Sequence, residues 1–263
     1  MTFKPHISSL LRKTGLLSLA ERARYSLEKI KYGGINRRFL KSHPKVVFPP
    51  PYYIYETYKL RYDEYWLDGL ETAKEIIDKF QSQPGWPRGP VKILDWGCGP
   101  GRVVRHMPSL LPPGSAVFGA DYNEVYIKWC KRNLKAIQFF RASLAPPLKF
   151  EPSFFDGVFG ISVFTHLSKA NHFAWVNELH RIVRPGAFVF LTTQGKAFLN
   201  KLSAKEKESF LQGQPIFRET TKEGSRLYSS FQPASFIEEI MMGKFEVLDY
   251  QPGAGMKDPS QDE

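Results

Sequence analysis

A glycine-rich turn that follows a short apolar segment constrains the fold of this chain more than any other feature. Residues 91–95 are apolar enough for a buried strand, and glycine occupies alternate positions directly after it, at Gly97, Gly99 and Gly101. Glycine permits positive φ angles and close approach of a ligand, and the helix expected from Arg102 offers unpaired amides to an anion. A strand–turn–helix unit of this kind suits a nucleotide-like ligand at the carboxyl end of a parallel sheet.

Short apolar strands alternate with helices through the middle of the sequence. Hydrophobic periodicity predicts strands at 91–95, 116–121, 137–142, 155–161 and 187–193, and helices at 67–80, 102–111, 124–134 and 169–183. Strands joined through helices form right-handed crossovers and a parallel sheet. We therefore expect an α/β fold, a Rossmann-like doubly wound and mostly parallel sheet with flanking helices, preceded by an N-terminal helical extension.

Three kinds of ligand fit a glycine-rich turn, and two of them are disfavoured here. A dinucleotide site needs a third glycine where this chain has Arg102, and Asp95 would place a negative charge beside the pyrophosphate. The Gly-Lys-Ser/Thr sequence of a phosphate-cradling loop is absent. The remaining ligand carries a ribose and is cationic near its reactive centre, so that nearby carboxylates stabilise it.

The ordered motifs in residues 91–195 resemble the class I S-adenosylmethionine-dependent methyltransferases. The turn is similar to their first motif, and Asp121 to the acid that ends their second strand. The matching segments are Asp95-Trp96-Gly97-Cys98-Gly99-Pro100-Gly101, Val117–Tyr122, Phe155-Asp156-Gly157-Val158, Ile161–Leu167 and Asn177–Ala187. By analogy, the chain looks like the small-molecule or glycan-type bacterial branch of this superfamily.

The resemblance implies S-adenosyl-L-methionine as cofactor and no metal. The glycine-turn amides would face its methionine portion, with Asp95 near the ammonium. Asp121 would accept hydrogen bonds from both ribose hydroxyls, and Tyr122 would flank the adenine. The full set of expected cofactor-binding residues is Asp95, Trp96, Gly97, Cys98, Gly99, Gly101, Asp121, Tyr122, Ser143 and Ser162.

On the acceptor side, His166 is the candidate catalytic residue. It follows the fourth predicted strand, and its ordinary pKa of about 6.5 suits a base; the alternative is a structural hydrogen-bonding role. Tyr52, Tyr53 and Tyr55 are candidate substrate-lining residues, with core packing as the alternative.

The identity of the acceptor is constrained mainly by what the sequence lacks. The Asp/Asn-Pro-Pro-aromatic motif of base-directed amino-methyltransferases and the Pro-Cys nucleophile of cytosine-C5 enzymes are absent after the fourth strand, where the chain reads Ile161-Ser162-Val163-Phe164. The function predicted is methyl transfer to a small-molecule, sugar or lipid-linked acceptor, with nucleic acid disfavoured. The alternative is a catalytically silent binding or scaffold protein of the same fold.

The net charge of +11 arises mostly in the first fifth of the chain. Residues 1–50 contain eleven Lys and Arg but only two acids, Glu21 and Glu28. Apolar residues recur there at helical spacing, at Leu16, Leu17, Ala20, Ala23, Leu27 and Ile30, and Gly33-Gly34 is expected to end this helix before a proline linker at 49–51. This apolar stripe packs on the rest of the protein or on a partner, or it lies on an anionic membrane surface. Nucleic-acid binding is disfavoured because the basic residues are not interleaved with exposed aromatic side chains in a recognisable module.

These features define the expected organisation. Residues 1–50 form a basic, partly helical extension, and residues 51–263 form the methyltransferase domain, with a motif core at 91–195 and a substrate-side insertion at about 196–232. The presence of only two cysteines predicts a reducing compartment. Because the sequence has no 18-residue apolar run and no signal-peptide core, we expect a cytoplasmic location, with peripheral contact at the inner membrane surface through residues 1–50. The oligomeric state is left open.

The C-terminal region departs from the class I pattern. Residues 245–250 fit the first strand of a terminal hairpin, but the polar residues 257–263 do not fit the second. Either that strand is absent or the natural chain continues, and a missing strand would leave 245–250 exposed for pairing.

Overall fold

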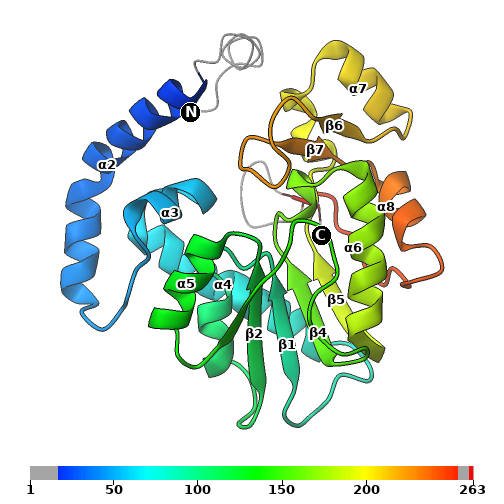
Figure 1. Ribbon diagram of the computed structural model, residues 1–263, viewed down its shortest axis with the longest axis horizontal. Coiled ribbons are helices and arrows are strands. Elements are labelled where there is room, and N and C mark those ends of the chain that lie inside the picture. Colours follow the sequence, from blue (N-terminus) through cyan, green and yellow to red (C-terminus); the bar gives the residue numbers. More distant parts are fainter. Residues whose placement is uncertain (1–16, 254–260, 263) are drawn as a thin grey trace.

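A five-stranded parallel sheet forms the centre of the protein (Figure 1). The computed structural model describes residues 17–253 and 261–262. The strands run in the order β3-β2-β1-β4-β5, and the pairs β1–β2, β1–β4, β2–β3 and β4–β5 are all parallel. Their bounds are β1 (Lys92–Trp96), β2 (Ala116–Asp121), β3 (Gln138–Arg141), β4 (Phe155–Gly160) and β5 (Val183–Leu191). The predicted fold class is confirmed.

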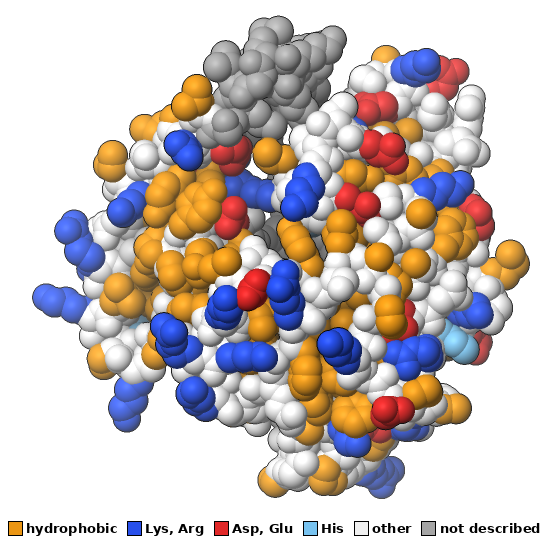
Figure 2. Space-filling view, in the orientation of Figure 1, with side chains coloured by type: hydrophobic (Ala, Val, Ile, Leu, Met, Phe, Trp, Pro, Cys, Tyr) orange, Lys and Arg blue, Asp and Glu red, His pale blue; other side chains and the backbone are white. Residues whose placement is uncertain are grey.

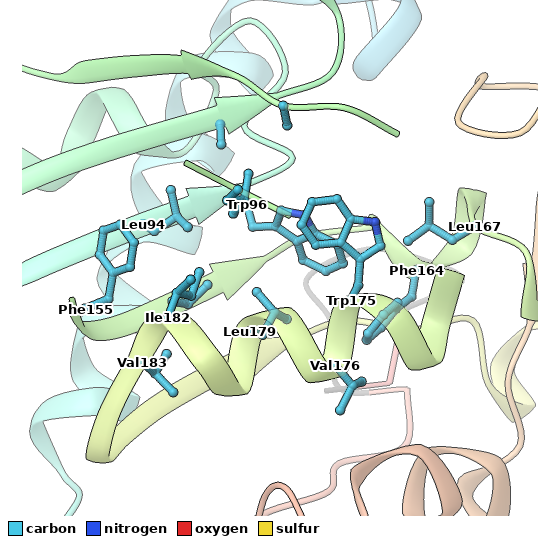
Figure 3. Packing of buried hydrophobic residues seen from close by; sticks show 14 of the residues in the cluster. Leu94, Trp96, Phe155, Phe164, Leu167, Trp175, Val176, Leu179, Ile182 and Val183 are labelled. Carbon is cyan, nitrogen blue, oxygen red and sulfur yellow. The ribbon is translucent and has the colours of Figure 1, made fainter. Parts of the chain in front are cut away.

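Helices cover both faces of this sheet because successive strand residues point to opposite sides. Ile93 packs in one buried cluster, with α4 (Tyr62–Gln81), the 3₁₀ helix η1 (Val104–Ser109) and α5 (Glu124–Asn133). The neighbouring Leu94 packs in the other cluster, with α6 (Lys169–Ile182) and α8 (Ala234–Met241). In this second cluster, Trp96 of β1 lies against Trp175 of α6, with ring centroids 4.9 Å apart (Figure 3).

Side-chain caps fix where two of these helices begin. The Asn123 side chain accepts a hydrogen bond from the amide of Val125 at the start of α5. The Ser168 side chain accepts one from the amide of Asn171 at the start of α6. These caps satisfy amides that have no partner within the helix. They place the start of each helix directly after the loop that follows β2 or β4.

The N-terminal extension forms α2 (Leu17–Ser42), followed by the short α3 (Pro51–Thr57). Gly33 and Gly34 were expected to end the first helix, and this prediction is wrong because α2 continues through them. Two glycines cost a helix only about 2 kcal/mol, and contacts beyond them hold the last turns. Asn36 donates to the carbonyl of Leu60 and accepts from the amide of Tyr62, at 3.1 and 2.9 Å.

An insertion follows β5 and lies beside the carboxyl ends of the strands (Figure 1). It contains the 3₁₀ helix η3 (Lys196–Lys201), α7 (Ala204–Leu211) and an antiparallel pair, β6 (Ile216–Arg218) and β7 (Ser229–Phe231). A capping box between Ser203 and Glu206 begins α7. The loop 219–228 between β6 and β7 returns toward the sheet and reaches the site described below.

The strand predicted at 245–250 does not form, so this prediction is also wrong. The amides of Lys244 and Phe245 both donate to the carbonyl of Met241 and close the end of α8. The amide of Phe245 is therefore not available for pairing with a neighbouring strand. Beyond β5, Thr193 instead pairs with Asp262 through two backbone hydrogen bonds of 2.9 Å. Among the described residues, no helix is long and apolar enough to cross a membrane.

Candidate active site

A cleft of about 640 Å³ opens at the carboxyl ends of β1, β2 and β4. This is the edge of a parallel sheet where ligands bind in doubly wound folds, and the volume lies in the range of small-molecule sites. One side of the cleft is formed by the glycine turn, by the residues after β2 and β3, and by the end of α3. The other side is formed by the residues after β4 and β5 and by the insertion.

The glycine turn shapes the cleft because its glycines have no side chains. A Cβ atom on Gly97 would lie 2.3 Å from Cγ2 of Val163, and its φ of +78° also disfavours any other residue. The turn amides, expected to face the cofactor, are instead bonded within the protein. Those of Gly97 and Cys98 donate to the carbonyl of Ala120, and that of Gly101 to the carbonyl of Cys98.

Opposite charges meet at the deep end of the cleft. Asp95 and Arg102 both line it, and the Arg102 guanidinium lies 4.9 Å from the ring centre of Tyr58. Burial raises the pKa of Asp95 well above its usual range, and the positive charge of Arg102 opposes this rise. Burial likewise lowers the pKa of Arg102. A carboxylate and a guanidinium that line the same cleft can complement the ammonium and carboxylate of an amino acid.

Asp121 ends β2 and points into the same cleft. Its two carboxylate oxygens accept hydrogen bonds from the amides of Gly99 and Asn123, at 2.8 and 2.7 Å. Burial raises the pKa of Asp121 to about 6, although both amides favour the charged form. The bonds fix the carboxylate at the end of the strand, where its remaining lone pairs can accept from two neighbouring hydroxyl groups.

Tyr122 connects this side of the cleft to the insertion. Its ring is partly exposed, and its hydroxyl donates to the carbonyl of Gly224, 2.7 Å away. The amide of Gly224 in turn donates to the carbonyl of His166. Further along the loop 219–228, Glu223 accepts from the amide of Ser168 at 2.6 Å and from the side chain of Asn171 at 2.8 Å. These bonds hold the loop across the mouth of the cleft.

His166 lines the opposite wall, in the 3₁₀ helix η2 (Phe164–His166) that follows β4. Its Nδ1 lies 2.8 Å from the carbonyl oxygen of Tyr228. Because a carbonyl only accepts, Nδ1 carries the proton and Nε2 keeps a lone pair. Burial lowers the pKa of His166, with Arg226 adding to the shift, so the imidazole is neutral at pH 7.

Two residues of this wall were not predicted from the sequence. The Oε1 atom of Gln194 is buried and has no hydrogen-bond partner in the described part of the chain. Lys201 of η3 lines the cleft with its ammonium 4.4 Å from the ring centre of Phe198, and burial lowers its pKa. Lys201 belongs to the insertion and Gln194 to the segment that leads into it from β5, and no motif marks either residue in the sequence.

Comparisons with known proteins identify the core of this architecture. Residues 93–186 match the family described as a methyltransferase domain. The chain is 30% identical over 124 residues to the mitochondrial ubiquinone biosynthesis O-methyltransferase of Rattus norvegicus, which covers 44% of this chain and 34% of that protein. It is 30% identical over 122 residues to the ubiquinone/menaquinone biosynthesis C-methyltransferase UbiE of Coxiella burnetii, covering 43% of this chain and 46% of that protein.

A solved structure shows the same fold over a larger part of the chain. The PH0226 protein from Pyrococcus horikoshii OT3 aligns with a TM-score of 0.54 and 16% identity, covering 76% of this chain and 92% of that chain. Residues 93–186 of the chain therefore carry a methyltransferase domain. The family resemblance is thereby confirmed. The chain spans between a third and a half of the length of the curated relatives that it matches.

Within this methyltransferase domain, the residues predicted to bind the cofactor are brought together. Those that line the cleft are Asp95, Trp96, Gly97, Cys98, Gly99, Asp121, Tyr122, Ser143 and Ser162. Gly101 lies just behind them, where a Cβ would meet Leu134 at 2.7 Å. Ser162 has a φ of +60°, and its hydroxyl donates to Gln261, 2.9 Å away. Burial raises the pKa of Cys98 well above its usual range, so its thiol is protonated.

The tyrosines expected to line the acceptor site lie elsewhere, which corrects that interpretation. Tyr52 and Tyr55 pack around Tyr25 of α2, each with ring centres 5.3 Å apart, and Tyr53 packs against Tyr126 of α5. The adjoining residues Glu56, Thr57 and Tyr58 line the cleft instead. The reason is the helical form of α3, which turns its last residues toward the glycine turn and its tyrosines toward α2 and α5. In the described part of the chain, no group of His, Cys, Asp and Glu side chains forms a metal site.

Proposed function

We propose that this methyltransferase domain transfers a methyl group from S-adenosyl-L-methionine to a hydroxyl group of a small-molecule acceptor. The observation that carries the proposal is a single cleft lined at one end by Asp95, Arg102 and Asp121 and on the opposite wall by His166 in a fixed tautomer. The first group fits an amino-acid nucleoside, and His166 fits a base beside it.

The residues at the deep end fit the expected cofactor. Asp95 and Arg102 would hold the ammonium and carboxylate of its methionine part, and Asp121 would accept from its ribose hydroxyls. Tyr122 and Ser143 lie where the adenine would extend. When bound, the sulfonium supplies an electrophilic methyl group for in-line displacement, a reaction that requires alignment and exclusion of water.

His166 would remove the proton of the acceptor hydroxyl. Its Nε2 lone pair is free because Nδ1 donates to the carbonyl of Tyr228, and its lowered pKa keeps the ring neutral at pH 7. Proton removal by a positioned side chain contributes about 10²–10⁴-fold to a rate. Gln194 Oε1, a buried acceptor with no partner in the described structure, would receive a hydrogen bond from a second polar group of the acceptor.

Two observations favour a small organic acceptor. The acceptor wall contains Phe190 and Phe198 beside Gln194 and Lys201, so it joins apolar surface to a few polar groups. The Rattus norvegicus relative is by name an O-methyltransferase of ubiquinone biosynthesis. A sugar or lipid-linked acceptor remains within the proposed class, whereas a nucleic acid is disfavoured.

The first experiment is calorimetric titration of S-adenosylmethionine and S-adenosylhomocysteine into the full chain. We expect micromolar binding that falls by at least about 100-fold in Asp121→Ala, because two charge-assisted hydrogen bonds are lost. Glu208→Ala on α7, an exposed acid away from the cleft, is the matched control and should bind like the intact chain.

The second experiment measures release of S-adenosylhomocysteine with a panel of phenols, catechols, sugars and amines. Turnover with hydroxyl acceptors that is lost in His166→Ala supports the proposal. Turnover with amines alone would contradict the hydroxyl assignment. Cofactor binding without turnover on any member of the panel would favour the alternative, a silent protein of this fold.

A further inference from the structure

The inward face of α2 holds both of its acids. Glu21 accepts a hydrogen bond from the Tyr55 hydroxyl at 2.8 Å and pairs with Arg226 at 3.2 Å. Glu28 accepts from the amide of Leu60, which precedes α4, at 3.4 Å. Further along this face, Asn36 bonds to the backbone before α4. The inward face is therefore committed to the body of the protein and fixes the orientation of the helix.

The outward face of α2 carries large apolar side chains that face solvent. Leu19, Leu27 and Ile30 are 60%, 68% and 80% exposed. Together with the exposed Ala23 they are spaced by three or four residues, which places them in one stripe along the helix. Isolated exposed leucines are ordinary in soluble proteins, but an aligned stripe on one helix marks a contact surface.

Exposed cations flank this stripe on both sides. Helical spacing puts Arg22 and Lys29 along one flank and Lys31 and Arg38 along the other. Figure 2 shows Lys and Arg side chains projecting from the edge of the molecule that α2 forms. Glu21 and Glu28 are the only acids among residues 1–50, and both contact the body of the protein, so neither lies among the cations of the outward face.

We infer that the outward face of α2 docks the protein on an anionic lipid surface. The stripe would enter the boundary between headgroups and acyl chains, while the flanking cations contact the headgroups. A nucleic-acid backbone would use the cations but has no use for Leu27 and Ile30 between them. A second copy of the chain would bring the same cations face to face.

Docking through the outward face leaves α2 between the lipid surface and the cleft. Glu21 of α2 pairs with Arg226, and Arg226 belongs to the loop 219–228 that crosses the mouth and also donates to the carbonyl of Tyr55, 3.1 Å away. The contacts of Arg226 thus fix the docked helix relative to the cleft. The docking itself does not rest on the proposed function.

Vesicle flotation of the full chain tests the docking surface. The vesicles are phosphatidylcholine alone or phosphatidylcholine with about one third phosphatidylglycerol. We expect flotation only with the anionic vesicles, weakening as salt rises. Leu27→Gln/Ile30→Gln removes the apolar stripe but keeps all charges and helix propensity, and should reduce binding at least about tenfold. Lys29→Glu/Lys31→Glu should reduce it as much or more.

The matched control lies on α7, at the other end of the molecule (Figure 1). Leu211 is 66% exposed there, and Lys205 and Lys207 are also exposed, so Leu211→Gln and Lys205→Glu/Lys207→Glu make equivalent changes. Both control variants should float like the intact chain. All variants should keep the melting temperature and the affinity for S-adenosylhomocysteine, because the altered side chains are exposed and outside the cleft.

Three results would overturn the inference. The first is equal flotation of the glutamine variant and the intact chain, which would mean that charge alone attracts the protein. The second is no flotation together with a change from dimer to monomer in the glutamine variant, measured by light scattering. The third is binding to RNA that outcompetes the anionic vesicles. Loss of cofactor binding in every form would instead count against the proposed function and leave the docking result intact.

Discussion

The two halves of the cleft are built in different ways. The cofactor half, residues 92–143, takes its side chains from the ends of three adjacent strands and from the turn between β1 and η1. The acceptor half, residues 161–232 with Gln261, is joined by bonds between distant positions, such as His166 with Tyr228 and Ser162 with Gln261. Apart from the end of α3, the first half therefore comes from one continuous segment of sequence, whereas the second depends on how the insertion folds back.

If the halves work separately, the largest effect of a single change should fall on turnover alone. His166→Ala removes the proposed base, so kcat should fall by about 10²–10⁴-fold while the dissociation constant of S-adenosylhomocysteine stays within about twofold. Single-turnover kinetics and calorimetry measure the two quantities. His180→Ala, on the exposed side of α6, should change neither. A parallel loss of cofactor affinity would show that the halves are coupled through His166.

Gly97 is where the halves touch, because a Cβ there would meet Val163 at 2.3 Å. Gly97→Ala should lower the free energy of unfolding by about 2–4 kcal/mol, combining the left-handed φ with overpacking. Gly186→Ala has a similar φ of +76° but open space around it, so it should cost only about 1–2 kcal/mol. Urea denaturation of both variants isolates the clash. Equal destabilisation would mean that Val163 moves aside freely.

A change of pH should affect the cofactor half of the cleft through the titration of Asp121. Its raised pKa of about 6 means that the carboxylate is mostly charged at pH 7 and mostly protonated at pH 5. Ribose hydroxyls bind better to the charged form, so cofactor affinity should fall by up to about tenfold between pH 7 and pH 5. Calorimetry across this range measures the fall, and Asp121→Asn should abolish it. A slope that persists in the asparagine variant would assign the titration to another group.

The smallest expected effect concerns the link between Tyr122 and Gly224. Tyr122→Phe removes one partly exposed hydrogen bond, worth about 1 kcal/mol, from the loop 219–228. Cofactor affinity should drop about two- to fivefold, and the loop should become more sensitive to proteolysis. Tyr32→Phe, on α2, is the comparison that should leave both measurements unchanged. An unchanged loop would show that the bonds of Glu223 and Arg226 suffice to hold it.

Much of the fold could be predicted because local signals were strong. The strand at 116–121 was predicted with the observed bounds, and α5 differs from its prediction by one residue. The helix predicted at 102–111 is instead the short 3₁₀ helix η1, because Pro108 lacks an amide for a regular α-helix. The error at Gly33-Gly34 arose where tertiary contacts outweighed local preference, and the error at 245–250 arose where local hydrogen bonds close the end of α8.

The same difference between local signals and tertiary contacts applies to the residues of the candidate site. Asp95, Gly97 and Asp121 stand at fixed offsets from buried strands, so their meeting at one sheet edge follows from a parallel topology. Gln194 directly follows the strand predicted at 187–193, which is the signal that could have found it. Lys201 has no such offset, and its place in the cleft depends on η3 and on the return of the insertion. The same reason explains why the cleft is lined by Glu56, Thr57 and Tyr58 and not by the predicted Tyr52, Tyr53 and Tyr55. The direction in which a helix face points is set by what the helix packs against.

The sequence by itself determined the sheet, the glycine turn and the acids at its edge, since strand periodicity and glycine conformation are properties of a few neighbouring residues. Only the tertiary structure decided which face of α2 meets the body, how the loop 219–228 closes the cleft, and which nitrogen of His166 holds the proton. Each of these depends on hydrogen bonds between residues far apart in the chain, whose partners are chosen by packing and not by local preference.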